Sequence, residues 1–324
     1  RRALNLVIES TKKDWLDLER PNCQWHAEIM YKHASLARFI TIVDHGITLF
    51  SYVGYVFLPL INIEVRTYTN LTDYGDRHLM LQTYYPYNYS KSFNFEMTSA
   101  SQYIAGFFIT ISYTIPENFF GALVFHSSAQ FEILAVQFER LFSNVYQTPS
   151  KNQVSKSVAK RNFTLKLKTL VDRHVHLMTM VSIIDNSFNF VILAQIVCTS
   201  VIICSAGYQM IEMFGGRYEE PSLFQYATLV GIIFTMMAHT LLECFASEIL
   251  TSKSQDVFES LCKSKWYADM TNRPVRDLIP VLNMSQIPRQ LTAGKVLVLS
   301  LPTFCTILKT TAGYISMLLA VTTR

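Results

Sequence analysis

The chain has 324 residues, of which 50% are apolar and only 16% are charged, and its formal net charge is +4 at pH 7. This composition, with its long apolar runs, places the chain among membrane proteins. The small net charge gives no support for nucleic-acid binding. We therefore expect an all-α membrane protein, a polytopic helical bundle whose main surroundings are the lipid bilayer.

Five apolar runs are long enough to cross the ~30 Å hydrocarbon core of a bilayer as helices. Before the first run, residues 1–38 are mixed and charged, which favours an amphipathic helix outside the bilayer. No initiator Met or signal peptide is present, so we expect a chain that is truncated at its N-terminus. The five runs cover approximately residues 39–63, 98–125, 188–214, 223–250 and 296–321.

Helical periodicity extends beyond two of these runs. The apolar spacing of the second run continues to Leu141, which predicts one long helix. A Ser/Lys-rich loop is expected over 148–161, and a helical pattern over 163–181 leads into the third run. The short turn at 215–221 makes the third and fourth spans antiparallel neighbours. In the last run, Pro302 predicts a kink.

No set of residues indicates an enzyme. The chain has no glycine-rich nucleotide loop, Walker loop or G-x-S-x-G element. His239 and Glu243 are four residues apart and can share a helix face, but no third ligand is evident. We expect no catalysis, no cofactor and no metal site. Asp44 and His45, near the start of the first run, are expected at the interface or paired with a partner.

Loop charges set the orientation. The segments 1–38, 126–187 and 251–295 hold 22 Lys and Arg residues, whereas the alternate loops 64–97 and 215–222 hold 4. The positive-inside rule places residue 1 in the cytoplasm and the C-terminus outside. This orientation decides against a G-protein-coupled receptor, whose tail is inside. The sequons at Asn70 and Asn88 are then external and open to glycosylation.

The end of the chain resembles the closing segment of insect odorant receptors. The resemblance rests on P-x-x-L-x-A-G-K, L-P-T-F-x-x-I-L-K and G-Y-I-S-M-L-L between Pro288 and Leu319, with Ser264, Trp266 and Tyr267 before them. It implies that residues 39–250 hold helices three to six of an expected seven and that 296–324 is the pore-lining seventh helix. It also implies that 251–295, with Phe258, Trp266 and Tyr267, belongs to a cytoplasmic anchor region between subunits.

The resemblance further implies a gate and an odorant site. The positions that match the apolar ring at the narrowest point of the pore are Met317 and Val321, with Ala320 between them. Lys309, near the middle of this helix, either acts electrostatically in the permeation path, pairs with an acid such as Glu117, or snorkels to the interface. Aromatic residues expected to line the odorant pocket are Tyr52, Tyr55, Tyr103, Phe107, Phe224 and Tyr226.

The implied function is that of a ligand-tuning subunit in an odorant-gated, non-selective cation channel. Its partners would be a volatile odorant and the shared olfactory co-receptor subunit, in a heterotetramer. Its location would be the plasma membrane of an olfactory neuron dendrite. Two alternatives are a gustatory receptor, whose terminal signature differs, and a secondary transporter, which would show inverted repeats.

Overall fold

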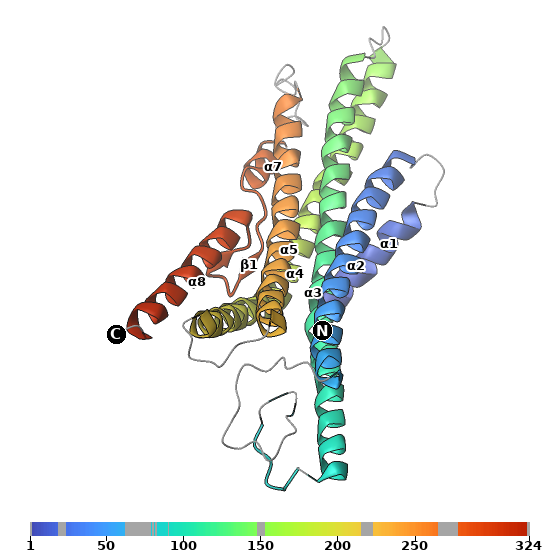
Figure 1. The fold of residues 1–324 in the computed structure, drawn as a ribbon. Helices are drawn as coiled ribbons and strands as arrows, with labels where there is room; N and C mark the ends of the chain where they lie inside the picture. The colour runs from blue at the N-terminus through green and yellow to red at the C-terminus, as the bar shows by residue number, and fades with distance from the viewer. Residues whose placement is uncertain are drawn as a thin grey trace. The chain divides into compact units, whose positions relative to one another are not determined.

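The computed structural model is helical, and its elements follow the apolar pattern of the sequence (Figure 1). The helices are α1 (Arg2–Asp17), α2 (Gln24–Leu60), α3 (Ser92–Gln147), α4 (Gln153–Phe214), α5 (Leu223–Lys263), α7 (Leu278–Ser285) and α8 (Leu301–Thr322). Two short antiparallel strands, β1 (Thr292–Ala293) and β2 (Leu297–Val298), precede α8. The structure describes residues 2–18, 24–61, 79, 81, 83–89, 91–147, 153–214, 223–264 and 278–322.

The described residues contain five helices that are long and apolar enough to cross a membrane. These helices are α2, α3, α4, α5 and α8, so the five predicted spans are confirmed as helices. The predicted continuation of the second span is also confirmed, because α3 is a single helix of 56 residues (Figure 1). α4 runs for 62 residues and joins the predicted helical pattern to the third span.

Three local predictions are wrong. The loop expected over 148–161 ends earlier, because α4 already begins at Gln153. The last span does not start at Val296, since the β1–β2 hairpin occupies that stretch and α8 begins at Leu301. Pro302 therefore lies in the first turn of α8 rather than at a kink. There the missing backbone N–H costs nothing, because the first turn of a helix has no intrahelical partner for it.

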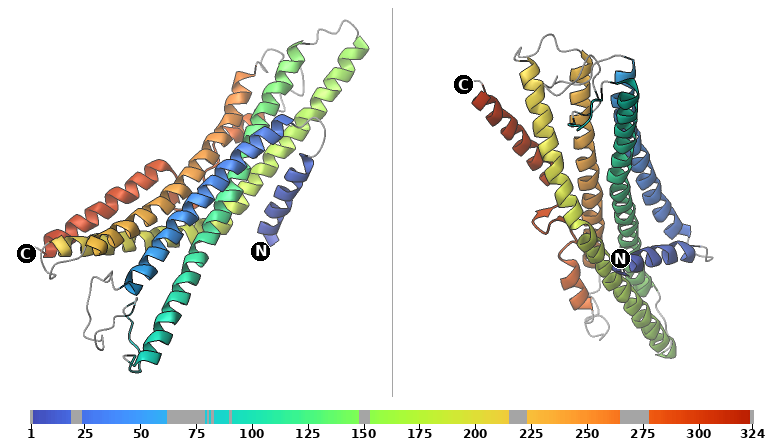
Figure 2. Two further views of the ribbon diagram at one scale, coloured as in Figure 1. Left: turned by 45° about the vertical axis from the view of Figure 1, so that its right-hand side comes forward. Right: turned by 90° about the horizontal axis from the view of Figure 1, so that it is seen from below.

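The chain divides into two compact units, each of which collects pieces of several helices. Unit 1 comprises Arg1–Phe39, Phe120–Leu193 and Glu243–Thr303, and unit 2 comprises Ile40–Phe119, Ala194–Leu242 and Phe304–Arg324. Figure 2 shows α1 as a short helix distinct from the long α2. α2, α3, α4 and α5 each contribute residues to both units.

Unit 1 has its core around the C-terminal half of α3. Phe125, Phe131 and Phe138 are each at most 2% exposed, and the seven-residue spacing of Phe131 and Phe138 returns to one side of a helix. Fully buried leucines, Leu177 of α4 and Leu250 of α5, belong to the same unit. Burial of apolar side chains on this scale is the main force that holds helices together outside lipid.

Unit 1 also contains an ion-pair cluster that ties α1 to the longer helices. Asp14 of α1 lies 2.7 Å from a guanidinium nitrogen of Arg173 on α4 and 3.1 Å from Nε2 of His126 on α3. Arg173 also donates to the side-chain oxygen of Gln130 at 2.9 Å. The three helices are thus joined by charged contacts as well as by apolar packing.

Unit 2 has fewer buried apolar side chains than unit 1 among the described residues. Its apolar cluster consists of Ala206, Met213 and Leu229, from α4 and α5. In α8, only 6% of the apolar window is buried within the chain. A helix that is apolar and yet uncovered in a single chain is suited to contact lipid or another subunit.

Candidate functional site

Three of the six expected odorant-site residues lie together in unit 2. The hydroxyl of Tyr52 on α2 donates a hydrogen bond to the backbone carbonyl of Tyr103 on α3 at 2.5 Å. The rings of Tyr52 and Phe107 are 6.3 Å apart and tilted by 50°. These contacts join α2 to α3 through aromatic side chains, a lining that suits a small apolar ligand.

The other three residues are placed differently. Tyr226 of α5 packs against the apolar cluster of α4 and α5. Tyr55 is partly buried on α2, and Phe224 is 43% exposed near the start of α5. The structure therefore groups Tyr52 with its α3 neighbours, and Tyr226 with a second patch of the same unit.

Three ionisable side chains converge inside unit 2, one from each of three helices. Nδ1 of His239 on α5 lies 2.8 Å from Oδ1 of Asp44 on α2 and 2.8 Å from Oε2 of Glu117 on α3. The three side chains are only 3%, 6% and 7% exposed, respectively. One ligand atom from each residue lies within 4.8 Å of the other two. We refer to Asp44, Glu117 and His239 as the buried triad.

Hydrogen bonds hold the triad in place. The hydroxyl of Thr48 donates to the backbone carbonyl of Asp44 at 2.8 Å, and its oxygen lies 3.0 Å from Nε2 of His239. The side-chain amide of Asn118 donates to Oδ2 of Asp44 at 2.7 Å. The Tyr113 ring and the imidazole of His239 lie nearly perpendicular, with ring centres 5.2 Å apart. Asp44 and His239 are thereby oriented by neighbours on α2 and α3.

The triad confirms one expectation and corrects another. Asp44 is paired with partners, as expected for an acid in a membrane helix. His239 contacts Asp44 and Glu117, two acids that the sequence did not place beside it. The suggested pairing of Lys309 with Glu117 is wrong, since Lys309 is exposed while the Glu117 carboxylate contacts His239. The sequence shows the three residues of the triad only as separate ionisable residues in apolar runs. Spacing along the chain does not reveal that distant helices bring them together.

The expected gate residues lie near the end of α8. Met317 is 65% exposed, and Ala320 and Lys309 are also exposed on this helix. Val321 lies within α8, but its side chain is outside the described part of the structure. Within a single chain the C-terminal half of α8 thus has much of its apolar surface uncovered.

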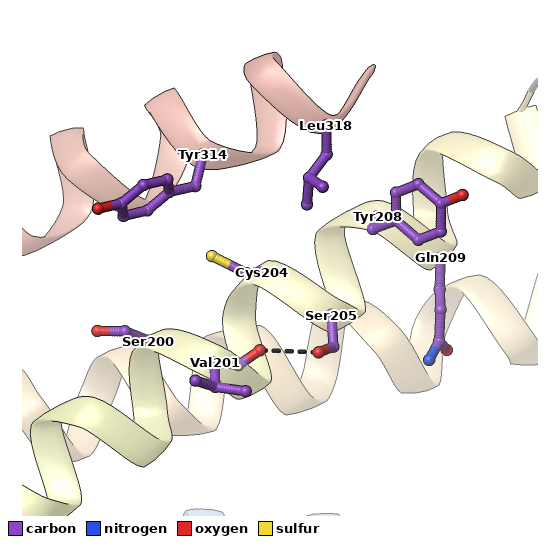
Figure 3. Close-up of a pocket in the computed structure, with 8 residues that line it drawn as sticks. All are labelled: Ser200, Val201, Cys204, Ser205, Tyr208, Gln209, Tyr314 and Leu318. Carbon is purple, nitrogen blue, oxygen red and sulfur yellow. Dashed lines mark hydrogen bonds between the residues drawn. The ribbon is translucent and has the colours of Figure 1, made fainter. Parts of the chain in front are cut away.

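A pocket that the sequence did not indicate lies between α4 and α8 in unit 2. It encloses about 400 Å³, and Figure 3 shows its lining. α8 contributes Tyr314 and Leu318, while α4 contributes Ser200, Val201, Cys204, Ser205, Tyr208 and Gln209. The two helices approach closely next to it, because a Cβ on Gly207 would lie 2.5 Å from Cδ1 of Ile315.

The L-T-A-G-K stretch (residues 291–295) contains β1 and part of the turn of the β1–β2 hairpin, and it docks on α4 within unit 1. Asp185 of α4 accepts hydrogen bonds from the backbone N–H of Thr292 at 2.7 Å and from its hydroxyl at 2.8 Å. The ammonium of Lys295 contacts the other oxygen of Asp185. Gly294 donates its N–H to the carbonyl of Asn189 at 2.8 Å. The stretch is therefore a docking element at the entrance to α8.

Several expected residues lie at the margin of the described structure or outside it. Asn88 is exposed, and its carbonyl accepts a hydrogen bond from Asn94 at 3.0 Å. Asn70 lies outside the described residues, as do Trp266 and Tyr267 of the expected anchor region. Phe258 is partly buried on α5.

Comparison with known proteins identifies relatives over most of the chain. The family model described as "7tm Odorant receptor" matches residues 8–312. Odorant receptor 13a of Drosophila melanogaster is 22% identical over 283 residues, which cover 83% of this chain. The same match covers 63% of that protein, so the chain spans less than two thirds of the length of this relative.

Solved structures show the same fold. The insect olfactory receptor OR5 from Machilis hrabei matches with a TM-score of 0.72 in its complex with eugenol and 0.71 without it. Sequence identity is 14% in both cases. The two matches each cover 91% of this chain, and 69% and 68% of the respective receptor chains.

Proposed function

The chain belongs to the odorant receptor family, and we propose that it is a ligand-tuning subunit of an odorant-gated, non-selective cation channel. The observation that carries this proposal is the family match over residues 8–312, which includes α2, α3, α4 and α5 entirely and the first half of α8. The protein would act in the plasma membrane of olfactory neuron dendrites, together with a co-receptor subunit in a heterotetramer. Its chemistry is binding and gating rather than catalysis.

The ligand would be a small volatile molecule held by the aromatic residues of unit 2. The contact of Tyr52 with Tyr103 and Phe107 supports a pocket wall between α2 and α3. Tyr55, Phe224 and Tyr226 would complete the lining. The eugenol complex of the similar receptor OR5 supports a small organic ligand for this fold.

The pore would be lined by α8. In a ring of four subunits, the face of α8 that a single chain leaves uncovered would meet its counterparts around the axis. Met317, Ala320 and Val321 would form the constriction, which closes by dewetting. Lys309, exposed on the same helix, would set the electrostatic field along the path. With the N-terminal side in the cytoplasm, Asn70 and Asn88 would carry glycans outside.

The gating mechanism would be a shift of population. An odorant that binds the open arrangement more tightly than the closed one biases the channel towards opening. α8 would move outward from the pore axis, and the hairpin docked on Asp185 would fix the start of that helix.

Recordings from cells that express the full-length protein with a co-receptor subunit test the proposal. We expect an odorant to evoke an inward cation current that requires both subunits. Phe107→Ala should shift the ranking of a panel of odorants and weaken the best ligand roughly tenfold, which equals the ~1.4 kcal/mol expected for part of an aromatic contact. Phe93→Ala is the matched control, since Phe93 lies on the same helix and is 74% exposed.

Two results would contradict the proposal. One is a current identical to that of the co-receptor alone although the chain is present at the cell surface. The other is an equal effect of the two alanine variants. The glycan at Asn88 reports both surface delivery and orientation. Asn88→Gln lowers the mass of the glycosylated protein only if the loop that contains Asn88 is external.

A further inference from the structure

We propose that the buried triad of Asp44, Glu117 and His239 is a binding site for a divalent transition-metal ion of the Zn²⁺ class. This site goes beyond the proposed odorant function and revises the expectation, from sequence, that the chain holds no metal. The proposal rests on the hydrogen-bond network around His239, on the charge of the site and on its ligand geometry.

The network fixes which imidazole nitrogen is available. Thr48 has one hydroxyl hydrogen, and it is donated to the backbone carbonyl of Asp44 at 2.8 Å. Towards Nε2 of His239, at 3.0 Å, the Thr48 oxygen therefore acts as an acceptor, so Nε2 carries a hydrogen. If the imidazole is neutral, Nδ1 then carries no hydrogen and presents a lone pair. That lone pair faces two carboxylate oxygens at 2.8 Å, an arrangement that is repulsive unless a cation lies between them.

The charge of the site calls for a cation from outside the chain. The other buried His–carboxylate contacts include a basic side chain, Arg173 beside Asp14 and Lys253 beside Glu132. Among the residues that the structure describes, the ion pairs of the triad involve His239 alone as the positive partner of two carboxylates. A divalent ion bound by a neutral imidazole and two carboxylates gives a neutral site, which lowers the cost of burial in a membrane helix bundle.

The geometry is that of an incomplete coordination shell. Three ligand atoms converge, and Oε1 of Glu117 and Nδ1 of His239 make no hydrogen bond of good geometry to any described residue. At metal–ligand distances of about 2.0–2.1 Å, tetrahedral ligands are about 3.3 Å apart, so the 2.8 Å contacts need to widen by about 0.5 Å. Three protein ligands leave the fourth position of a tetrahedral Zn²⁺ open to water.

Neighbouring side chains orient the ligands as in known metal sites. A metal-bound imidazole usually donates its second N–H to an acceptor, which Thr48 provides here. Asn118 holds the outer oxygen of Asp44 and so directs Oδ1 to the centre. A mixed set of one imidazole and two carboxylates suits Zn²⁺, whereas Mg²⁺ prefers oxygen ligands alone and keeps several waters.

The test is Zn²⁺ binding by the purified full-length receptor in detergent. After chelator treatment and reloading, elemental analysis should find one Zn²⁺ per wild-type chain and none in His239→Gln. His33→Gln is the matched control. His33 is also a buried histidine in contact with a carboxylate, that of Glu132, but Lys253 balances this charge. The control should retain its Zn²⁺.

A milder variant keeps the test meaningful where His239→Gln does not fold. Thr48→Val removes the acceptor of Nε2 but none of the ligands, and should weaken Zn²⁺ binding roughly 10–100-fold. The melting temperature of the wild type should rise with Zn²⁺ but not with Mg²⁺. The proposal is overturned if the wild type binds no more Zn²⁺ than His239→Gln, or if Thr48→Val binds it as tightly as the wild type. In either case the cation at Nδ1 is a proton.

Discussion

Replacing Gly294 with Ala tests whether the hairpin before α8 is held by backbone geometry and close packing. Gly294 has a φ of +60°, where an Ala costs ~1–2 kcal/mol because its Cβ crowds the carbonyl. The new Cβ would also lie 2.4 Å from Cδ2 and 3.2 Å from Cγ of Leu193 on α4. Forcing that side chain aside costs ~1–3 kcal/mol.

Ala also lowers the conformational entropy of the unfolded chain, which offsets part of these two costs. The net loss in the free energy of unfolding is then roughly 2–4 kcal/mol. The docked hairpin would be disfavoured at least ~30-fold, since 1.4 kcal/mol is a factor of ten. Thermal unfolding of the purified receptor, followed by size-exclusion chromatography with fluorescence detection, measures the loss. A chain of 324 residues loses roughly 1–2 °C in melting temperature per kcal/mol.

Gly121→Ala is the control for this prediction. Gly121 is in α3 within the same unit, and a Cβ there meets nothing within 4 Å. Ala should keep or slightly raise stability at this helical position. Leu193→Ala removes the side chain that the new Cβ would overlap. The double variant Gly294→Ala with Leu193→Ala should therefore lose less stability than the sum of the two single losses. Equal melting temperatures for Gly294→Ala and Gly121→Ala would refute the reasoning.

Three further predictions concern other helices. Burial raises the pKa of Asp14, but His126 and Arg173 outweigh this effect and hold the pKa below the usual ~3.9. The ion pairs of Asp14 therefore stabilise the fold fully above pH ~3.9, and this stabilisation is lost as the pH falls through the pKa of the folded state. Asp14→Asn should make the free energy of unfolding less dependent on pH in this acid range. Ser300→Ala removes a side-chain acceptor at the start of α8 and should cost ~1 kcal/mol in chemical unfolding. Gly207→Ala would place a Cβ 2.5 Å from Cδ1 of Ile315 on α8. This overlap should push Ile315 away from α4 and change channel opening without lost surface expression, and unchanged currents would contradict this.

The sequence alone determined the number and type of the spanning elements. Apolar runs of sufficient length leave few alternatives to helices, because a bilayer offers no partners for unpaired backbone groups. The same pattern predicted the extension of α3, whose apolar periodicity continues through Phe131 and Phe138. Terminal motifs of the sequence were sufficient to recognise the family that the comparison then showed.

The tertiary structure alone decided which distant residues meet. Asp44, Glu117 and His239 are single ionisable residues in three separate apolar runs, and only the rotation and depth of three helices bring them within 4.8 Å. Similarly, Asp185 has no sequence neighbour that marks it as the acceptor for Thr292, 107 residues later. Periodicity describes which face of a helix is apolar, but it contains no information on the neighbour that covers that face.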